Sequence, residues 1–152
     1  LHLKNTIKLY SQFQVILKLS KCDFISFFKY DYSKRYIVLH FILSVDERGR
    51  IIQESMLDNL PATSNLLTLN IMNADDKDLY SITTEKIKEK NLKTFEMMDS
   101  RGIKKIFYQN IFNDKENPLG FVAISYKDEN YIIPEGDKVE ILRIIQKIKT
   151  FI

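Results

Sequence analysis

Apolar residues recur at helical spacing at both ends of the chain. Near the N-terminal end they lie three or four positions apart, at Leu3, Ile7, Tyr10, Phe13, Ile16 and Leu17. Near the C-terminal end a second stripe comprises Ile141, Ile144, Ile145, Ile148 and Ile152. This spacing gathers apolar side chains on one face of a helix. We therefore predict a helix from Leu3 to Ser20 and a last helix that begins with Pro134 in its first turn.

Between these helices the chain is rich in β-branched and aromatic residues, which favour strands. Phe24–Tyr30 and Tyr36–Val45 are apolar segments of strand length, and the polar residues between them predict an antiparallel hairpin. Lys104–Phe112 and Leu119–Tyr126 are joined by a polar loop in the same way. Leu79–Thr84 alternates well enough to predict a further short strand.

The middle of the chain has a less regular pattern. We expect one helical turn over Ser55–Pro61 and a short helix capped by Thr63 or Ser64 that continues to Met72. The charged residues Glu85–Lys90 indicate a solvated stretch. A helix from about Asn91 to Arg101 should follow, with Gly102 ending it.

This order of elements predicts an α+β fold, in one domain that spans residues 1–152. It comprises a mostly antiparallel sheet of five or six strands and two terminal helices. Because each terminal helix has a single apolar face, both can pack on the same face of the sheet.

The composition is that of a soluble globular protein, with 45% hydrophobic and 28% charged residues. A net charge of +3 does not indicate nucleic-acid binding, and no run approaches the ~18 apolar residues of a membrane-spanning helix. A single cysteine forms no internal disulfide, so we expect a reducing, cytoplasmic or cytoplasm-facing location. The sequence begins at Leu1, and we expect a trimmed upstream part: a tag, another domain or a membrane anchor.

The final third of the chain resembles the GAF domain family. Pro118-Leu119-Gly120 leads into an apolar run as in the family's last strand, and Tyr131 and Glu135 stand for the aromatic residue and the acidic helix start that follow. The residues around Cys22 are similar to the entry into the first GAF strand, as in short GAF-like proteins encoded by bacteriophages. The resemblance implies a GAF/PAS-like sheet with both terminal helices on one face. The other face, under short helices and loops, would hold a small-molecule pocket.

The family's cyclic-nucleotide signature is matched only in part. Lys127 matches its lysine and Glu135 stands in place of its aspartate, whereas Tyr126 and Gly136 depart from it. The resemblance therefore supports the fold and not nucleotide binding. It implies a structural pair, Lys127–Glu135, that ties the last strand to the last helix.

No catalytic or metal-binding set of residues is evident. Cys22 stands beside Asp23, which would raise the pKa of its thiol, so a structural role is favoured over a nucleophilic one. The family's sulfoxide reductases need more than one cysteine. His2 and His40 have no metal-ligand spacing, and the acidic residues near Asp75 lack the glycine of a calcium loop. We expect a non-catalytic protein without metal or cofactor.

In a GAF-like fold the ligand pocket would be lined by polar and aromatic residues of the strands and of the middle segment. The candidates are His40, Asn70, Tyr80, Thr83, Phe95, Tyr108 and Asn110. These residues either bind a small ligand or fill a core and bind nothing. The first alternative predicts a sensory or regulatory domain that signals or forms a homodimer through its terminal helices. The second predicts a ligand-free interaction or structural module, such as a phage-encoded one tethered upstream.

Overall fold

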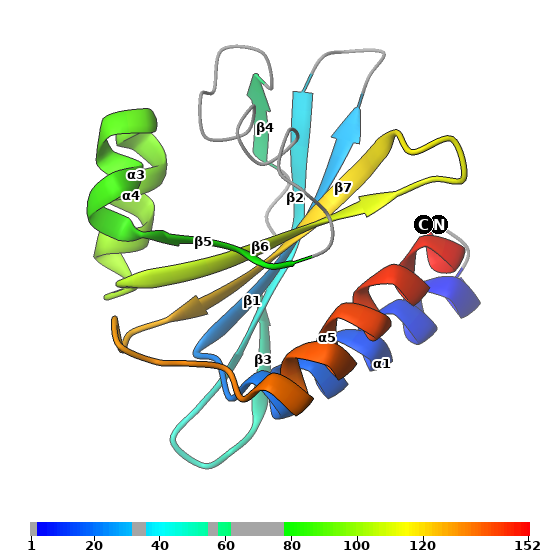
Figure 1. Ribbon diagram of the computed structural model, residues 1–152, viewed down its shortest axis with the longest axis horizontal. Coiled ribbons are helices and arrows are strands. Elements are labelled where there is room, and N and C mark those ends of the chain that lie inside the picture. Colours follow the sequence, from blue (N-terminus) through cyan, green and yellow to red (C-terminus); the bar gives the residue numbers. More distant parts are fainter. Residues whose placement is uncertain (1–2, 32–35, 55–57, 62–77) are drawn as a thin grey trace.

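A sheet of seven antiparallel strands runs through the middle of the computed structural model (Figure 1). The structure describes residues 3–31, 36–54, 58–61 and 78–152. The strand order is β3-β2-β1-β7-β6-β5, and β4 also pairs with β2. The strands are β1 Phe24–Asp31, β2 Tyr36–Val45, β3 Ile51–Glu54, β4 Asp58–Pro61, β5 Tyr80–Thr83, β6 Lys105–Phe112 and β7 Pro118–Tyr126.

The short strands β3 and β4 share one edge of β2. β3 pairs with Ile42–Val45, and β4 pairs with Tyr36–Leu39. A line across the sheet therefore crosses six strands, although the sheet has seven in all. This agrees with the five or six strands expected from the sequence.

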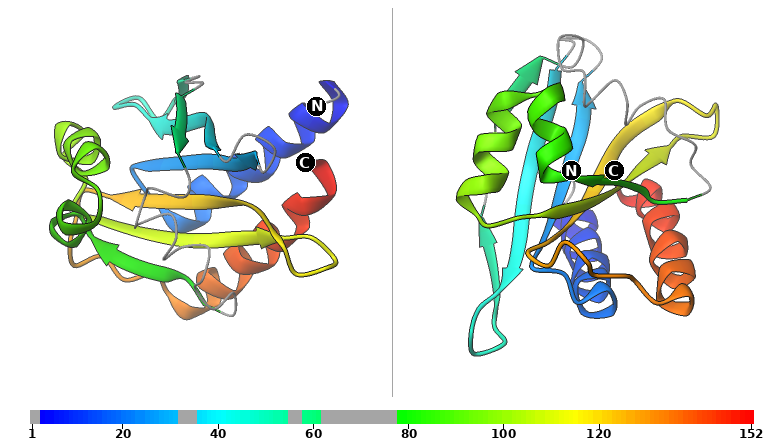
Figure 2. Two further views of the ribbon diagram at one scale, coloured as in Figure 1. Left: turned by 90° about the horizontal axis from the view of Figure 1, so that it is seen from above. Right: turned by 60° about the vertical axis from the view of Figure 1, so that its left-hand side comes forward.

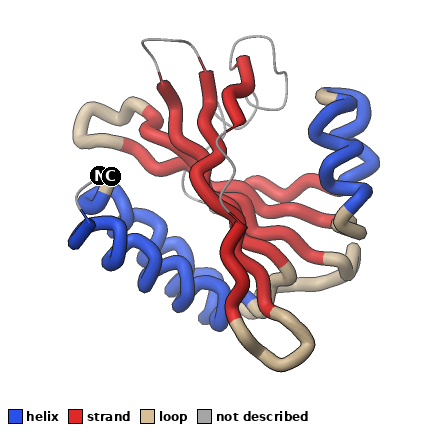
Figure 3. The backbone as a smooth tube through the Cα atoms, turned by 180° about the vertical axis from the view of Figure 1, so that it is seen from behind, coloured by secondary structure: helices blue, strands red, loops and turns tan. Residues whose placement is uncertain are grey.

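The two terminal helices lie side by side on one face of the sheet, as predicted. Helix α1 (Leu3–Ser20) and helix α5 (Glu135–Ile148), with its 3-10 extension η1 (Lys149–Phe151), run antiparallel (Figures 1 and 2). The Lys8 ammonium lies 5.9 Å from the centre of the Phe151 ring, so the start of α1 adjoins the end of η1. Helices α3 (Thr84–Lys90) and α4 (Leu92–Ser100) lie on the opposite side (Figure 3).

Each face of the sheet has its own buried cluster. The terminal-helix core joins apolar residues of α1 and α5 to alternate residues of β1, β6 and β7, among them Phe13, Ile25, Ile111, Val122 and Ile145. Ile7, which the sequence placed on the same stripe of α1, is instead 61% exposed, and Leu9 is buried. The aromatic core covers the opposite face and comprises Phe28, Tyr30, Ile42, Ile82, Ile87, Met98, Ile103, Ile106, Tyr108, Phe121 and Ala123. Because successive side chains of a strand point to opposite faces, both clusters draw on the same strands.

Three expectations about the middle of the chain were wrong or incomplete. Asp58–Pro61 is a strand and not part of a helical turn, because its backbone pairs with Tyr36–Leu39 of β2. The stretch from Glu85 is not simply solvated: it forms α3, whose Ile87 is fully buried in the aromatic core. Strand β3 was not predicted. The helix expected over Thr63–Met72 lies outside the described residues.

The expected helix ends in the second half of the chain are confirmed. The Asn91 side chain accepts a hydrogen bond from the backbone N–H of Thr94 and so caps α4. Gly102 follows α4 with a φ of 72°, a conformation that glycine adopts without steric cost. Pro134 is the N-cap of α5, one position before its first residue. Within the described part of the chain, no helix is long and apolar enough to cross a membrane.

Candidate functional site

A buried polar pair lies within the aromatic core. The hydroxyl of Tyr30 on β1 donates a hydrogen bond to Oδ1 of Asn110 on β6, at 3.4 Å. Both residues are buried, with Tyr30 6% and Asn110 3% exposed. A polar group withdrawn from water is costly unless it is hydrogen-bonded, so this pair is a specific feature of a mostly apolar face.

Aromatic rings surround this pair, with Phe121 of β7 at their centre. The Phe28 ring stacks on Phe121 with centroids 4.5 Å apart. The rings of Tyr108 and Tyr30 contact Phe121 at 5.6 and 5.8 Å. The candidate site is therefore an aromatic wall that presents tyrosine hydroxyls and one carboxamide.

Tyr108, one of the buried tyrosines of this wall, stays un-ionised at neutral pH. Burial raises the pKa of Tyr108 well above its usual range, and Tyr80, whose ring centroid is 6.4 Å away, adds to the rise. The Tyr108 hydroxyl thus acts as a neutral donor or acceptor. The buried polar residues of the described chain are all uncharged: Ser20, Ser26, Thr84, Gln109, Asn110 and Ser125.

Four of the predicted pocket residues meet around the aromatic core. Tyr108 and Asn110 belong to the face of β6 that carries it, Tyr80 is paired with Tyr108, and Phe95 of α4 packs against the cluster. Thr83 is half-buried and belongs to the alternate face of β5, since Ile82 contributes to the core.

Of the remaining two predicted pocket residues, only the backbone of His40 is described. The backbone of His40 is the extra residue at a register shift in β2, because Phe41 pairs with Phe27 and Leu39 with Phe28. Asn70 lies outside the described residues.

Sequence reasoning missed Tyr30, the hydrogen-bond partner of Asn110. The signal was present in the period-two pattern of Phe24–Tyr30, in which Phe28 and Tyr30 fall on the same face. Because this segment is apolar on both faces, alternation alone did not single out Tyr30.

The lone cysteine has no features of a nucleophile. Cys22 is 6% exposed, and burial raises the pKa of its thiol to about 12; the Ser20 hydroxyl opposes this rise and the Asp23 carboxylate adds to it. A thiol with this pKa is protonated at neutral pH, whereas the thiolate is the reactive form. Cys22 therefore serves packing in the terminal-helix core.

Lys127 and Glu135 do not form an ion pair among the described residues. The backbone N–H of Lys127 donates to Oδ2 of Asp23 at 2.7 Å, and its ammonium lies 5.8 Å from the centre of the Phe24 ring. These contacts tie the end of β7 to the start of β1. Across the described ranges, no group of three or more His, Cys, Asp or Glu side chains is arranged to hold a metal ion.

Comparison by sequence finds no matching family model and no significantly similar curated protein. Comparison by structure finds GAF domains. The GAF domain of a two-component sensor histidine kinase from Bacillus halodurans has a TM-score of 0.69 at 13% identity, and the match covers 95% of this chain and 90% of that chain. The GAF domain/HD domain protein from Geobacter sulfurreducens has a TM-score of 0.67 at 10% identity, covering 94% and 88%.

The third structure is a red/green cyanobacteriochrome in its red light-absorbing state. Its TM-score is 0.68 at 11% identity, and the match covers 96% of this chain and 92% of that chain. Identities this low show the fold alone. The arrangement of sheet and helices thus belongs to a shared architecture, and the chain has the fold of a GAF domain.

Proposed function

We propose that the protein is a non-catalytic sensory or regulatory domain that binds a small ligand on its aromatic face. The observation that carries this proposal is the buried Tyr30–Asn110 pair among aromatic rings, on the sheet face opposite the terminal helices. Ligand sites are mostly apolar and aromatic with a few convergent polar groups. Sensor proteins among the structural neighbours, a histidine kinase and a cyanobacteriochrome, are consistent with this role.

The described groups of this face favour an uncharged, flat ligand. Its rings offer stacking surfaces, and its polar atoms are neutral hydroxyls and a carboxamide. Transfer of a charged group into such surroundings is costly unless an opposite charge accompanies it. The protonated thiol of Cys22, on the other side of the sheet, supports the non-catalytic part of the proposal.

A second candidate function is a ligand-free interaction module. One observation favours it: Phe28 and Tyr108 both pack directly against Phe121, and all three are at most 6% exposed. In this case the Tyr30–Asn110 bond would only complete a closed core.

Native mass spectrometry of the purified chain distinguishes the two candidates. A sensory domain should carry a co-purified mass that is lost under denaturing conditions, or should show a higher melting temperature with a member of a metabolite panel. Asn110→Leu should abolish either signal, because it removes the carboxamide and keeps a side chain branched at the same carbon.

The matched control is Gln109→Leu. Gln109 is the neighbouring buried residue of β6 and pairs with Val122 of the terminal-helix core, so its side chain belongs to the opposite face. It should leave ligand binding unchanged. A wild-type chain with no bound mass and no thermal shift would contradict the sensory proposal and favour the ligand-free one.

For the output of the domain we propose that two copies pair through their terminal helices. Apolar side chains point to solvent on both helices: Ile7 and Val15 of α1 are 61% and 42% exposed, and Val139 of α5 is 60% exposed. Burial of such side chains between two copies would remove apolar surface from water, which favours association.

Sedimentation equilibrium tests this pairing. Ile7→Lys and Val139→Lys should each shift the chain toward monomer, because a lysine ammonium would have to be desolvated at the interface. Leu92→Lys, at an exposed apolar residue of α4 on the other side of the sheet, is the control and should leave the association unchanged. A wild-type chain that is monomeric at all concentrations would contradict the pairing.

A further inference from the structure

Asn110 is hydrogen-bonded toward both layers of the molecule. Its side-chain Oδ1 accepts from the Tyr30 hydroxyl within the aromatic core, at 3.4 Å. Its backbone carbonyl oxygen accepts from Nε2 of Gln146, a residue of α5, at 3.3 Å. One residue of β6 is thus bonded directly to the candidate ligand face and to the C-terminal helix.

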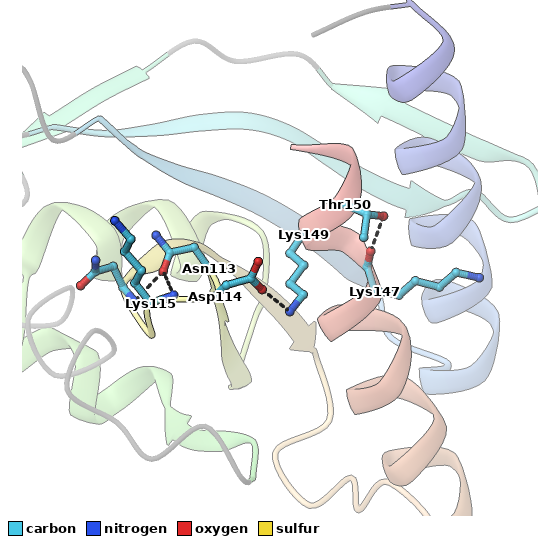
Figure 4. A network of polar contacts seen from close by, with 7 residues as sticks. Asn113, Asp114, Lys115, Lys147, Lys149 and Thr150 are labelled. Carbon is cyan, nitrogen blue, oxygen red and sulfur yellow. Dashed lines mark hydrogen bonds and ion pairs between the residues drawn. The ribbon is translucent and has the colours of Figure 1, made fainter.

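The turn after β6 makes a second contact with the end of the chain. Nζ of Lys149 pairs with Oδ1 of Asp114 at 3.3 Å (Figure 4). Asn113 fixes this turn, since its Oδ1 accepts from the backbone N–H groups of Lys115 and Asn117 at 2.9 Å each. The turn would therefore move as one unit, and its ion pair would transmit that movement to Lys149.

The two contacts lie along one side of α5 and η1. Gln146 and Lys149 are three positions apart, a spacing that brings side chains to the same side of a helix. Between Asn110 and Asp114, Ile111 packs in the same core as Ile145 and Ile148. The last part of β6 therefore packs against the last turn of α5.

The end of β6, after Tyr108, also extends beyond its described pairing with β5. Among the described residues, β5 pairs with β6 over Lys105–Tyr108, and the pairing with β7 has a register shift between Ile111 and Phe112. An irregular pairing locally disrupts the ladder of hydrogen bonds. Among the described residues, the end of β6 is thus held by β7 and by α5.

We propose that Asn110 is the positioning residue that couples the aromatic face to the C-terminal helix. A hydrogen bond made to its carboxamide on the aromatic side sets the position of its backbone carbonyl, and hence of Gln146 and the last turn of α5. This inference rests on the proposed function for its meaning: a ligand that takes the place of the Tyr30 hydroxyl would be the input, and α5 the output.

The coupling is tested without any ligand, by NMR of the full chain. Tyr30→Phe removes the hydroxyl that binds Asn110 and leaves the ring. We expect the side-chain NH2 resonances of Gln146 to shift and the backbone amides of 144–148 to exchange about two- to fivefold faster, as loss of one modest hydrogen bond would give.

The matched control is Tyr80→Phe, which deletes a hydroxyl from another tyrosine beside the same core. It should leave Gln146 and the exchange of α5 at their wild-type values. Equal responses to the two variants, or no response to Tyr30→Phe, would overturn the proposal.

A reciprocal variant covers the case in which Tyr30→Phe fails to fold. Coupling between two sites acts in both directions, so Gln146→Leu should shift the side-chain NH2 resonances of Asn110. Unchanged Asn110 resonances in that variant would overturn the proposal. Because no ligand is added, a failure here is distinct from a failure of ligand binding, which the mass measurement reports.

Discussion

The Tyr126 hydroxyl donates a hydrogen bond to the backbone carbonyl oxygen of Ser20 over 2.6 Å. The two residues stand at the end of β7 and the end of α1, are 106 positions apart in sequence, and are both buried. Carbonyl groups in the last turn of a helix have no partner within the helix. Tyr126 thus satisfies a group that would otherwise be buried without a hydrogen bond, and it attaches α1 to the middle of the sheet.

We predict that Tyr126→Phe lowers the free energy of unfolding by about 1–3 kcal/mol, because the Ser20 carbonyl is left buried and unsatisfied. Urea denaturation followed by circular dichroism measures this change. The control is Tyr131→Phe. The Tyr131 ring stacks on that of Tyr126 with centroids 4.4 Å apart, and this contact survives loss of the hydroxyl. Similar losses in both variants would show that the Tyr126–Ser20 bond is not the cause.

Burial of Cys22 makes the stability of the protein depend on pH in the alkaline range. Its pKa is raised from 9.0 to about 12 in the folded chain. Between these values the unfolded thiol has lost its proton while the folded one keeps it. The folded state then binds more protons than the unfolded state, so the free energy of unfolding falls as pH rises.

The predicted contribution of Cys22 is therefore fully present below pH 9 and is lost between pH 9 and about pH 12. A single proton gives a slope of about 1.4 kcal/mol per pH unit. Urea titrations at pH 8, 9 and 10 should show a shallower decline in Cys22→Ala than in the wild type, because all other titrating groups are common to both. Parallel declines would contradict the assignment.

The parts of the fold that were predicted correctly are those whose pattern is local. The stripe that includes Phe13 and Ile16 defines α1 by its spacing alone, and both side chains are fully buried. Asp58–Pro61 carries no such pattern, because it is a strand only through its pairing with the distant Tyr36–Leu39. Helix α3 has a single buried apolar residue, Ile87, which is too few to mark a helical face among charges.

The candidate site shows the same division. Tyr108 and Asn110 are two positions apart on one strand, so their shared face followed from the sequence. The bonds of Asn110 to Tyr30 and Gln146 span 80 and 36 positions, and no spacing rule connects residues so far apart. Sequence alone therefore located one strand of the site, while the contacts that give it a possible output required the three-dimensional arrangement.

Asn91 joins α3 to α4, and we predict that its side-chain capping bond stabilises α4. The Asn91 side chain caps α4, and its backbone N–H donates to the carbonyl oxygen of Ile87 in α3. Asn91→Ala should lower the free energy of unfolding by about 1 kcal/mol. Asn91→Ser retains a capping oxygen and should restore most of that loss. A serine variant no more stable than the alanine variant would contradict the capping role.

Gly120 is the position in the sheet where a methyl group should be least tolerated. It is paired with Lys29 on β1 and with Ile111 on β6. A Cβ added there would overlap the carbonyl oxygen of Phe28 and lie 3.1 Å from the Cα of Lys29. Both obstacles are backbone atoms of a central strand, so they cannot be relieved by turning a side chain.

We therefore predict that Gly120→Ala lowers the free energy of unfolding by about 1–3 kcal/mol, the usual effect of overpacking a core. The same chemical change at Gly136 should act in the opposite direction. A Cβ at Gly136 meets nothing within 4 Å, and the residue lies in the first turn of α5, where alanine is favoured over glycine by roughly 0.5–1 kcal/mol. Melting temperatures of the two variants should thus fall on opposite sides of the wild-type value. A Gly120→Ala protein as stable as the wild type would mean that β1 and β7 are not packed as closely as the structure places them.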